Sequence, residues 1–124
     1  MRTFKFRGKG IKSGQWFYGS VVPFGNSAYI FKMFRLLRME HAEVDPATVG
    51  QFTGLTDADG KDIYEGDLLL SDENAEVFEV VYDAPRFCFK DNDFGFRFLN
   101  HPEFFHVIGN IHDNKKLLEK GDDQ

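Results

Sequence analysis

A run of carboxylates between residues 57 and 67 is the segment best suited to metal chemistry. Its members are Asp57, Asp59, Asp62, Glu65 and Asp67. If Gly60 takes the sixth position of a calcium loop, the first and twelfth positions fall on Leu55 and Gly66, which have no side-chain ligand to offer. Asp also favours turns, because its carboxylate accepts hydrogen bonds from nearby backbone N–H groups. We therefore predict tight turns here and no metal site.

Histidines near the C-terminus form the second candidate metal site. His106 and His112 point to the same side of an extended strand, but six residues separate them by about 20 Å, too far for one ion. His101 precedes a proline and belongs to a loop. We expect neither a metal nor any other cofactor.

A nucleophile is the third chemical possibility. Cys88 lies between two phenylalanines, which is typical of a small buried hydrophobe in a strand. No serine lies in a nucleophile-elbow pattern, and no glycine-rich phosphate loop is present. The sequence thus has no enzyme signature and we predict no enzyme; a hydrolase that uses Asp and His side chains is the remote alternative.

Basic residues are concentrated at the N-terminus. Residues 1–39 hold eight Lys or Arg and no Asp or Glu, whereas the remainder holds seven against 20. Three interpretations compete: the basic segment packs beside its own acidic body, it meets another copy in a homo-oligomer, or it binds nucleic acid. The candidate contact residues are Lys5, Arg7, Lys9, Lys32, Arg35 and Arg38.

The elements that must position these residues are short strands. The chain has 15 Phe among 124 residues and 12 Gly, which favours many short strands with tight turns. Residues 3–8 alternate, with Phe4 and Phe6 on one side and Lys5 and Arg7 on the other, so rings and charges would face opposite ways and the charged side would face solvent.

Further expected strands follow the same patterns. They cover residues 15–22, 68–70, 76–82, 86–89, 95–99 and 105–111. Residues 29–38 fit a strand or a helix, and Lys32, Arg35 and Arg38 line one face only if they are helical. Asp45-Pro46 predicts a short helical turn, and a last short helix ends before Gly121.

Length and composition indicate one domain, residues 1–124, without a membrane-spanning run or a secretory signal. A single cysteine excludes an internal disulfide. We therefore expect a cytoplasmic protein that does not associate with membranes.

The motifs together resemble the YopX family of phage and prophage proteins. The resemblance rests on Lys5-Phe6-Arg7-Gly8, on the central block 44–67 with its VDPATVGQFTGL segment, and on 107–114. It implies a mainly β fold divided into N-terminal strands (1–43), an SH3-like barrel (44–114) and a short helical tail (115–124). It also implies a bacterial cytoplasmic setting, and it brings no catalytic residues. The motif residues read as structural are Gly50, Gly54, Gly60, Gly66, Asp67, Gly109 and Asn110.

From these observations we expect a non-catalytic phage accessory protein that binds another protein or its own copies. Nucleic-acid binding by the basic N-terminal face is the alternative.

Overall fold

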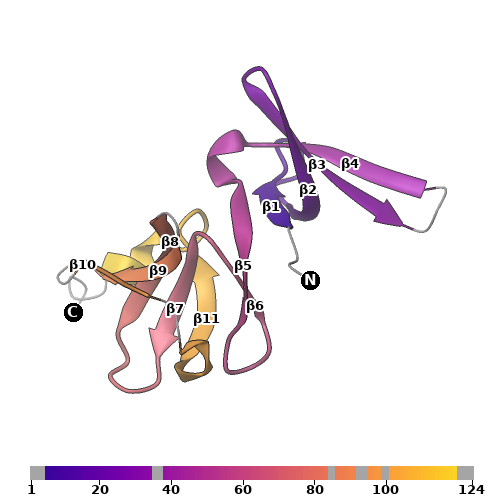
Figure 1. Ribbon diagram of the computed structural model, residues 1–124. Coiled ribbons are helices and arrows are strands. Elements are labelled where there is room, and N and C mark those ends of the chain that lie inside the picture. Colours follow the sequence, from indigo (N-terminus) through magenta and orange to yellow (C-terminus); the bar gives the residue numbers. More distant parts are fainter. Residues whose placement is uncertain (1–4, 35–37, 84–85, 92–94, 99–100, 120–124) are drawn as a thin grey trace. The chain divides into compact units, whose positions relative to one another are not determined.

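The computed structural model describes residues 5–34, 38–83, 86–91, 95–98 and 101–119 (Figure 1). The fold is mainly β, as predicted, and the described helical segments are short 3-10 turns. The chain divides into two compact units, Met1–Phe52 (unit 1) and Thr53–Gln124 (unit 2). This division lies nine residues after the expected boundary at residue 43, because the first residues of β5 pair with β1.

Unit 1 is an antiparallel sheet. Its strands are β1 (Phe6–Lys9), β2 (Trp16–Phe24), β3 (Ser27–Phe34), β4 (Arg38–Val44) and the start of β5 (Gly50–Thr56). They lie in the order β4-β3-β2-β1-β5. Residues 29–34 and 38 are therefore in strands, so the helical alternative for 29–38 is wrong for this described part; residues 35–37 lie outside it.

One side of this sheet forms the core of unit 1. Ala28, Ile30 and Val44 are buried, and Phe6 and Phe17 are among the half-buried residues packed against them. Residue alternation along each strand places these side chains on one side of the sheet.

The end of β4 is covered by the chain that follows β1. Gly10 forms a bridge with Val44, the Ile11 N–H donates to the Glu43 carbonyl at 3.1 Å, and the Asp45 N–H donates to the Lys9 carbonyl at 2.9 Å. A 3-10 turn, η1 (Pro46–Thr48), follows at once. The predicted cap is confirmed, because the Asp45 carboxylate accepts from the Ala47 N–H at 3.0 Å.

Unit 2 holds the rest of β5 and the later strands. They are β6 (Asp62–Tyr64), β7 (Asp67–Ser71), β8 (Val77–Asp83), β9 (Arg86–Asp91), β10 (Gly95–Phe98) and β11 (Phe105–Asn110), with η2 (Pro102–Phe104) and η3 (Lys115–Glu119). Five of these strands form an antiparallel sheet in the order β10-β9-β8-β7-β11. Where a short C-terminal helix was predicted, the structure has the short 3-10 segment η3.

Aromatic and branched side chains fill the core of unit 2. Ile63, Leu69, Phe78, Val80 and Phe105 are buried together. The Phe78 ring meets the Phe105 ring edge-on, with centroids 6.0 Å apart, an arrangement that aromatic quadrupoles favour. Cys88 is 1% exposed, which confirms its prediction as a buried small hydrophobe.

Turns rather than a metal loop explain the carboxylate run. The Asp57 carboxylate accepts the backbone N–H groups of Asp59, Lys61 and Val107 at 2.8–2.9 Å. The Asp67 carboxylate accepts from the Tyr64 N–H at 2.7 Å. Both acids are buried and serve the backbone, as the turn interpretation predicts. Across the residues that the structure describes, no helix is long and apolar enough to cross a membrane.

Candidate interaction surface

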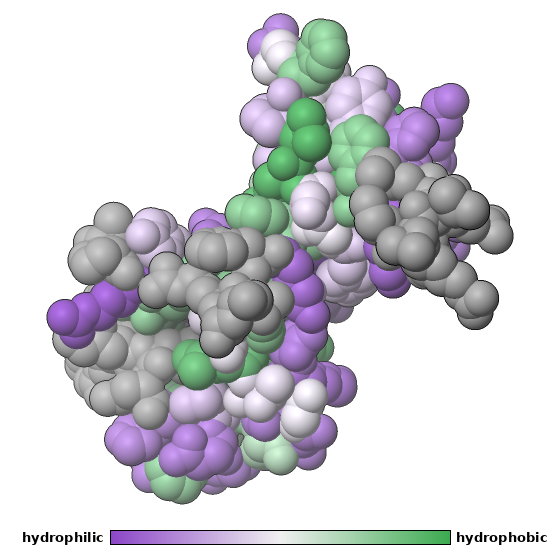
Figure 2. Space-filling view, turned by 45° about the vertical axis from the view of Figure 1, so that its right-hand side comes forward, coloured by the Kyte–Doolittle hydropathy of each residue, from purple (hydrophilic) through white to green (hydrophobic). Residues whose placement is uncertain are grey.

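The side of the unit 1 sheet opposite its core exposes large apolar side chains. Tyr18, Val22 and Phe24 alternate along β2 and are 43%, 43% and 73% exposed. In the strand register, Phe31 pairs with Ser20 and His41 pairs with Phe31, so these rings lie on the same side. We call the surface formed by Tyr18, Val22, Phe24, Phe31 and His41 the outer face. The hydropathy view of unit 1 shows hydrophobic side chains gathered around the β2–β3 hairpin (Figure 2).

Two rings of the outer face stack on each other. Phe31 and His41 stack with centroids 5.3 Å apart and planes 22° apart. His41 lies on β4, the last strand of the sheet, and is exposed. This stacked pair therefore reaches the edge of the sheet.

The basic residues of β1 are placed differently from the sequence prediction. Arg7 is only 6% exposed, and its guanidinium carbon lies 4.8 Å from the centroid of the Trp16 ring. The prediction of a solvent-facing Arg7 is therefore wrong, because β2 supplies large rings on the same side of the sheet. Phe6 does face the core, as predicted. Rings and charges are nevertheless not separated, because β2 places Trp16 and Tyr18 on the same side of the sheet as Arg7.

The other candidate contact residues do not form one patch. The Lys5 ammonium lies 4.7 Å above the Phe52 ring, and Lys9 is half-buried, with its N–H donating to the Thr48 hydroxyl. Lys32 is exposed on β3, on the core side of the sheet. Arg35 lies outside the described residues, and of Arg38 only the backbone, at the start of β4, is described.

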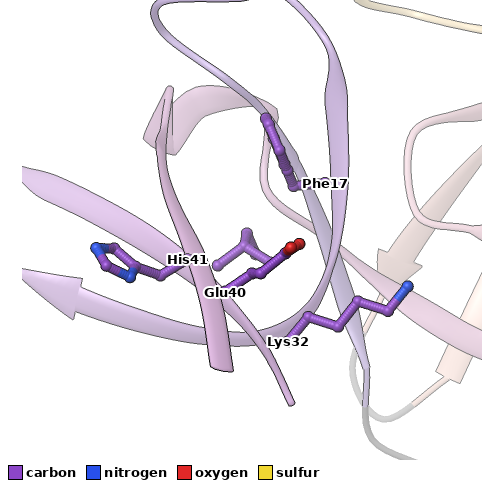
Figure 3. A pocket seen from close by; sticks show the side chains of 5 residues that line it. Phe17, Lys32, Glu40 and His41 are labelled. Carbon is purple, nitrogen blue, oxygen red and sulfur yellow. The ribbon is translucent and has the colours of Figure 1, made fainter. Parts of the chain in front are cut away.

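A pocket of about 350 Å³ opens beside β4 (Figure 3). Its lining consists of Phe17, Ile30, Lys32, Glu40 and His41. Figure 3 shows the Glu40 carboxylate and the Lys32 ammonium pointing one way and the His41 ring pointing the other. Apolar walls with one cation and one carboxylate can hold an apolar side chain and fix a polar group next to it.

A second pocket of the same volume shares Phe17 and His41 with the first. It is lined in addition by Lys12 and Glu43, among others. Both pockets therefore adjoin the strand that ends the sheet.

Unit 2 contains a charged cluster that sequence reasoning missed. His106 Nδ1 lies 2.8 Å from an Asp59 oxygen, and Nε2 lies 2.6 Å from an Asp72 oxygen. Hydrogen bonds to Asp59 and Asp72 raise the pKa of His106 above its ordinary value. Protonated imidazole donates from both nitrogens, so this cluster ties two loops to β11.

The same cluster is not arranged for metal binding. Its carboxylates contact opposite nitrogens of one ring, so a single ion cannot replace the proton on both sides. Throughout the described ranges, no group of three His, Cys, Asp or Glu side chains is positioned around a metal site. The sequence separations of 47 and 34 residues explain why no local pattern revealed the cluster.

The motif glycines and Asn110 occupy structural positions. Gly54, Gly60 and Gly66 have φ angles of +89°, +85° and +95°, in the left-handed region that favours glycine. Gly50 is buried opposite Arg7. A Cβ at Gly109 would overlap the Asn114 side chain, and the Asn110 side chain accepts the N–H groups of residues 112 and 113.

Comparisons with known proteins now place the chain. The family model described as YopX protein matches residues 5–119. The crystal structure of protein EF1440 from Enterococcus faecalis is similar, with 24% identity, a TM-score of 0.61, and coverage of 95% of this chain and 99% of that chain. This likeness shows a shared fold. A search of curated proteins finds no match. From the family match over nearly its whole length, the chain belongs to the YopX family.

Proposed function

We propose that this protein is a non-catalytic interaction module that binds another protein through the outer face of unit 1. The observation that carries the proposal is the exposed apolar stripe of β2, with Phe24 at 73% exposure and Tyr18 and Val22 at 43%. Large apolar side chains exposed on one side of a sheet favour protein docking, since covering them removes apolar surface from water.

Aromatic residues strengthen this interpretation. Tyr and Phe are enriched at protein interfaces, where they bury a large area at low cost in side-chain entropy. Around the stripe, Phe31 and His41 form a stacked pair.

The test is affinity capture from bacterial lysates with quantitative mass spectrometry. We expect proteins that bind the wild-type chain to be lost with the double variant Val22→Ser/Phe24→Ser. The matched control is Tyr82→Ser, which removes a 50% exposed aromatic ring from unit 2. Partners that persist with the double variant, or that fail equally with the control, contradict the outer face as the binding surface.

Nucleic-acid binding is a second candidate, favoured by one observation. The strand register places Lys9 opposite Trp16, so cations and rings share one side of the sheet, as on single-strand binding surfaces. Labelled single-stranded DNA would show saturable anisotropy that weakens steeply with salt. Lys9→Glu, which reverses the charge opposite Trp16, would weaken it, whereas Lys32→Glu, on the other side of the sheet, would not; Arg7 is unsuitable because it is buried. Absence of binding at low salt removes this candidate.

For its setting, we propose a phage- or prophage-encoded accessory protein of the bacterial cytoplasm. The YopX family match supports this origin. We further propose that unit 2 is similar to an SH3-like barrel. Its support is the core shared by β6, β7, β8 and β11, against which Leu55 of β5 also packs.

A further inference from the structure

The outer edge of β4 is a backbone surface that can accept another strand. Within the described ranges β4 ends the sheet, and its outer side forms backbone hydrogen bonds with the segment Lys9–Ile11 at residues 43–45. An edge strand presents N–H and C=O groups that template the pairing of a further chain.

Two hydrogen bonds reveal which residues point outward. The Glu43 carbonyl and the Asp45 N–H both bond to the Lys9–Ile11 segment. In an antiparallel strand, alternate residues direct their N–H and C=O to the same side. The backbone groups of His41 therefore point outward as well, beyond the point where Ile11 leaves the edge.

Side-chain pockets flank this edge. Both 350 Å³ pockets include His41, one with Ile30 and Lys32 and the other with Lys12. A strand added beside His41 would send alternate side chains to the core side, where the first pocket lies, and to the outer face, where Phe31 stacks on His41.

We propose that an extended peptide segment of the partner protein binds by adding a strand to the outer edge of β4. Backbone hydrogen bonds to His41 provide affinity, and an apolar side chain in the pocket of Phe17 and Ile30 provides specificity. This inference rests on the proposed protein-binding function and names the chemistry of its partner.

Charge selects the kind of peptide. Unit 1 holds eight Lys or Arg against three Asp or Glu, but all three acids, Glu40, Glu43 and Asp45, lie on β4 or directly after it, so both charges are present along this edge. Each pocket is lined by one cation and one carboxylate, Lys32 with Glu40 in the first and Lys12 with Glu43 in the second, so the peptide that fits carries a basic and an acidic side chain next to its apolar residue.

The experiment compares His41→Pro with His41→Ala in the full-length chain. Proline removes the outward N–H and blocks pairing at an edge without breaking the bonds between β3 and β4. Alanine removes the imidazole and keeps the N–H. Peptides selected from a displayed random 12-residue library on the wild-type protein are the probes, and thermal unfolding of both variants checks that they fold.

The expected result is a loss of peptide affinity of about tenfold to a hundredfold in His41→Pro and a few-fold at most in His41→Ala. Selected peptides should combine an apolar residue with one basic and one acidic residue, and on binding they should protect the His41 amide from hydrogen exchange. Equal affinity for wild type and His41→Pro overturns the inference. Should His41→Pro fail to fold, amide protection at His41 in the wild-type complex decides instead.

Other outcomes separate this inference from the proposed function. Peptides lost with Val22→Ser/Phe24→Ser but retained by His41→Pro leave the outer face as the binding surface and overturn strand addition. A dimer that dissociates in His41→Pro means that a second copy occupies the edge, which also overturns the peptide proposal. If no peptide is selected while the outer face still captures proteins, strand addition is overturned and the proposed function stands.

Discussion

Removal of the Asp57 carboxylate should destabilise unit 2 more than removal of an exposed carboxylate. One carboxylate oxygen accepts the N–H groups of Asp59 and Lys61, at 2.8 and 2.9 Å, within its own turn. The other accepts the N–H of Val107, on β11, at 2.8 Å. Asp57 is 5% exposed, so water does not readily replace this acceptor.

The magnitude follows from which donors lose their acceptor. The N–H groups of Asp59 and Lys61 belong to exposed residues and can bond to water, whereas Val107 is half-buried, so water replaces the acceptor of its N–H less readily. A buried donor left without an acceptor costs about 1–3 kcal/mol, and hydrogen bonds to charged groups contribute about 1.5–3 kcal/mol each. We therefore expect Asp57→Ala to lower the free energy of unfolding by about 3 kcal/mol.

Asp57→Asn should cost less. An amide keeps one acceptor oxygen for the turn but turns a donor toward the Val107 N–H, so about 1–2 kcal/mol is expected. The exposed Glu73→Ala is the matched control and should change stability by less than about 0.5 kcal/mol.

The effect should also depend on pH. Burial by itself raises the pKa of Asp57, but hydrogen bonds from Val107, Lys61 and Asp59 outweigh it and hold the pKa below its ordinary value. A carboxyl whose pKa is lower in the folded state stabilises the protein above its unfolded pKa, near ~4, and loses this contribution as pH falls through the folded pKa. The difference between wild type and Asp57→Ala should thus shrink below about pH 4.

Urea unfolding followed by circular dichroism measures these differences at pH 7 and at pH 3.5. With an m-value of about 1–3 kcal/mol/M, a loss of about 3 kcal/mol should lower the midpoint of Asp57→Ala by about 1–3 M. A midpoint equal to that of Glu73→Ala, or a difference that grows as pH falls, would refute the assignment of Asp57 as a structural acceptor.

Three further predictions concern unit 2. An NMR titration should give His106 a pKa above its ordinary ~6.5, and Asp72→Asn should lower that pKa. Because the pKa is raised in the folded state, the contribution of His106 to stability is full below pH ~6.5 and declines as pH rises through the folded pKa. Gly66→Ala, at φ +95°, should lower the unfolding midpoint in urea by an amount equivalent to about 1–2 kcal/mol, and an unchanged midpoint would contradict the need for glycine there. The thiol of Cys88, 1% exposed, should react with a thiol-specific chromogenic disulfide only after denaturant is added, so rapid labelling of the native protein would disprove its burial.

Local features were predictable from sequence because their causes lie within a few residues. Asp45 caps η1 through an N–H two residues away, and Asp67 accepts an N–H three residues before it. Gly60 and Gly66 take positive φ angles in the turns where glycine costs least. The alternation of β1 likewise identified Phe6 as a core residue.

Residues 29–38 show where local pattern fails. Cationic residues spaced three apart can line one face of a helix. They are equally compatible with a strand, in which they would alternate between its two sides. The structure places residues 29–34 in β3, between β2 and β4, because pairing with two neighbours satisfies its backbone.

Placement of the functional surfaces depended on which strands became neighbours. Sequence alone fixed the type of fold, the turns, and the surplus of cations near the N-terminus. Only the tertiary structure decided that Trp16 covers Arg7, that His106 lies between Asp59 and Asp72, and that His41 lies on the edge of the sheet. The physical reason is that alternation assigns a side chain to one side of its own strand, whereas burial and ion pairing are set by residues that strand pairing brings in from distant parts of the chain.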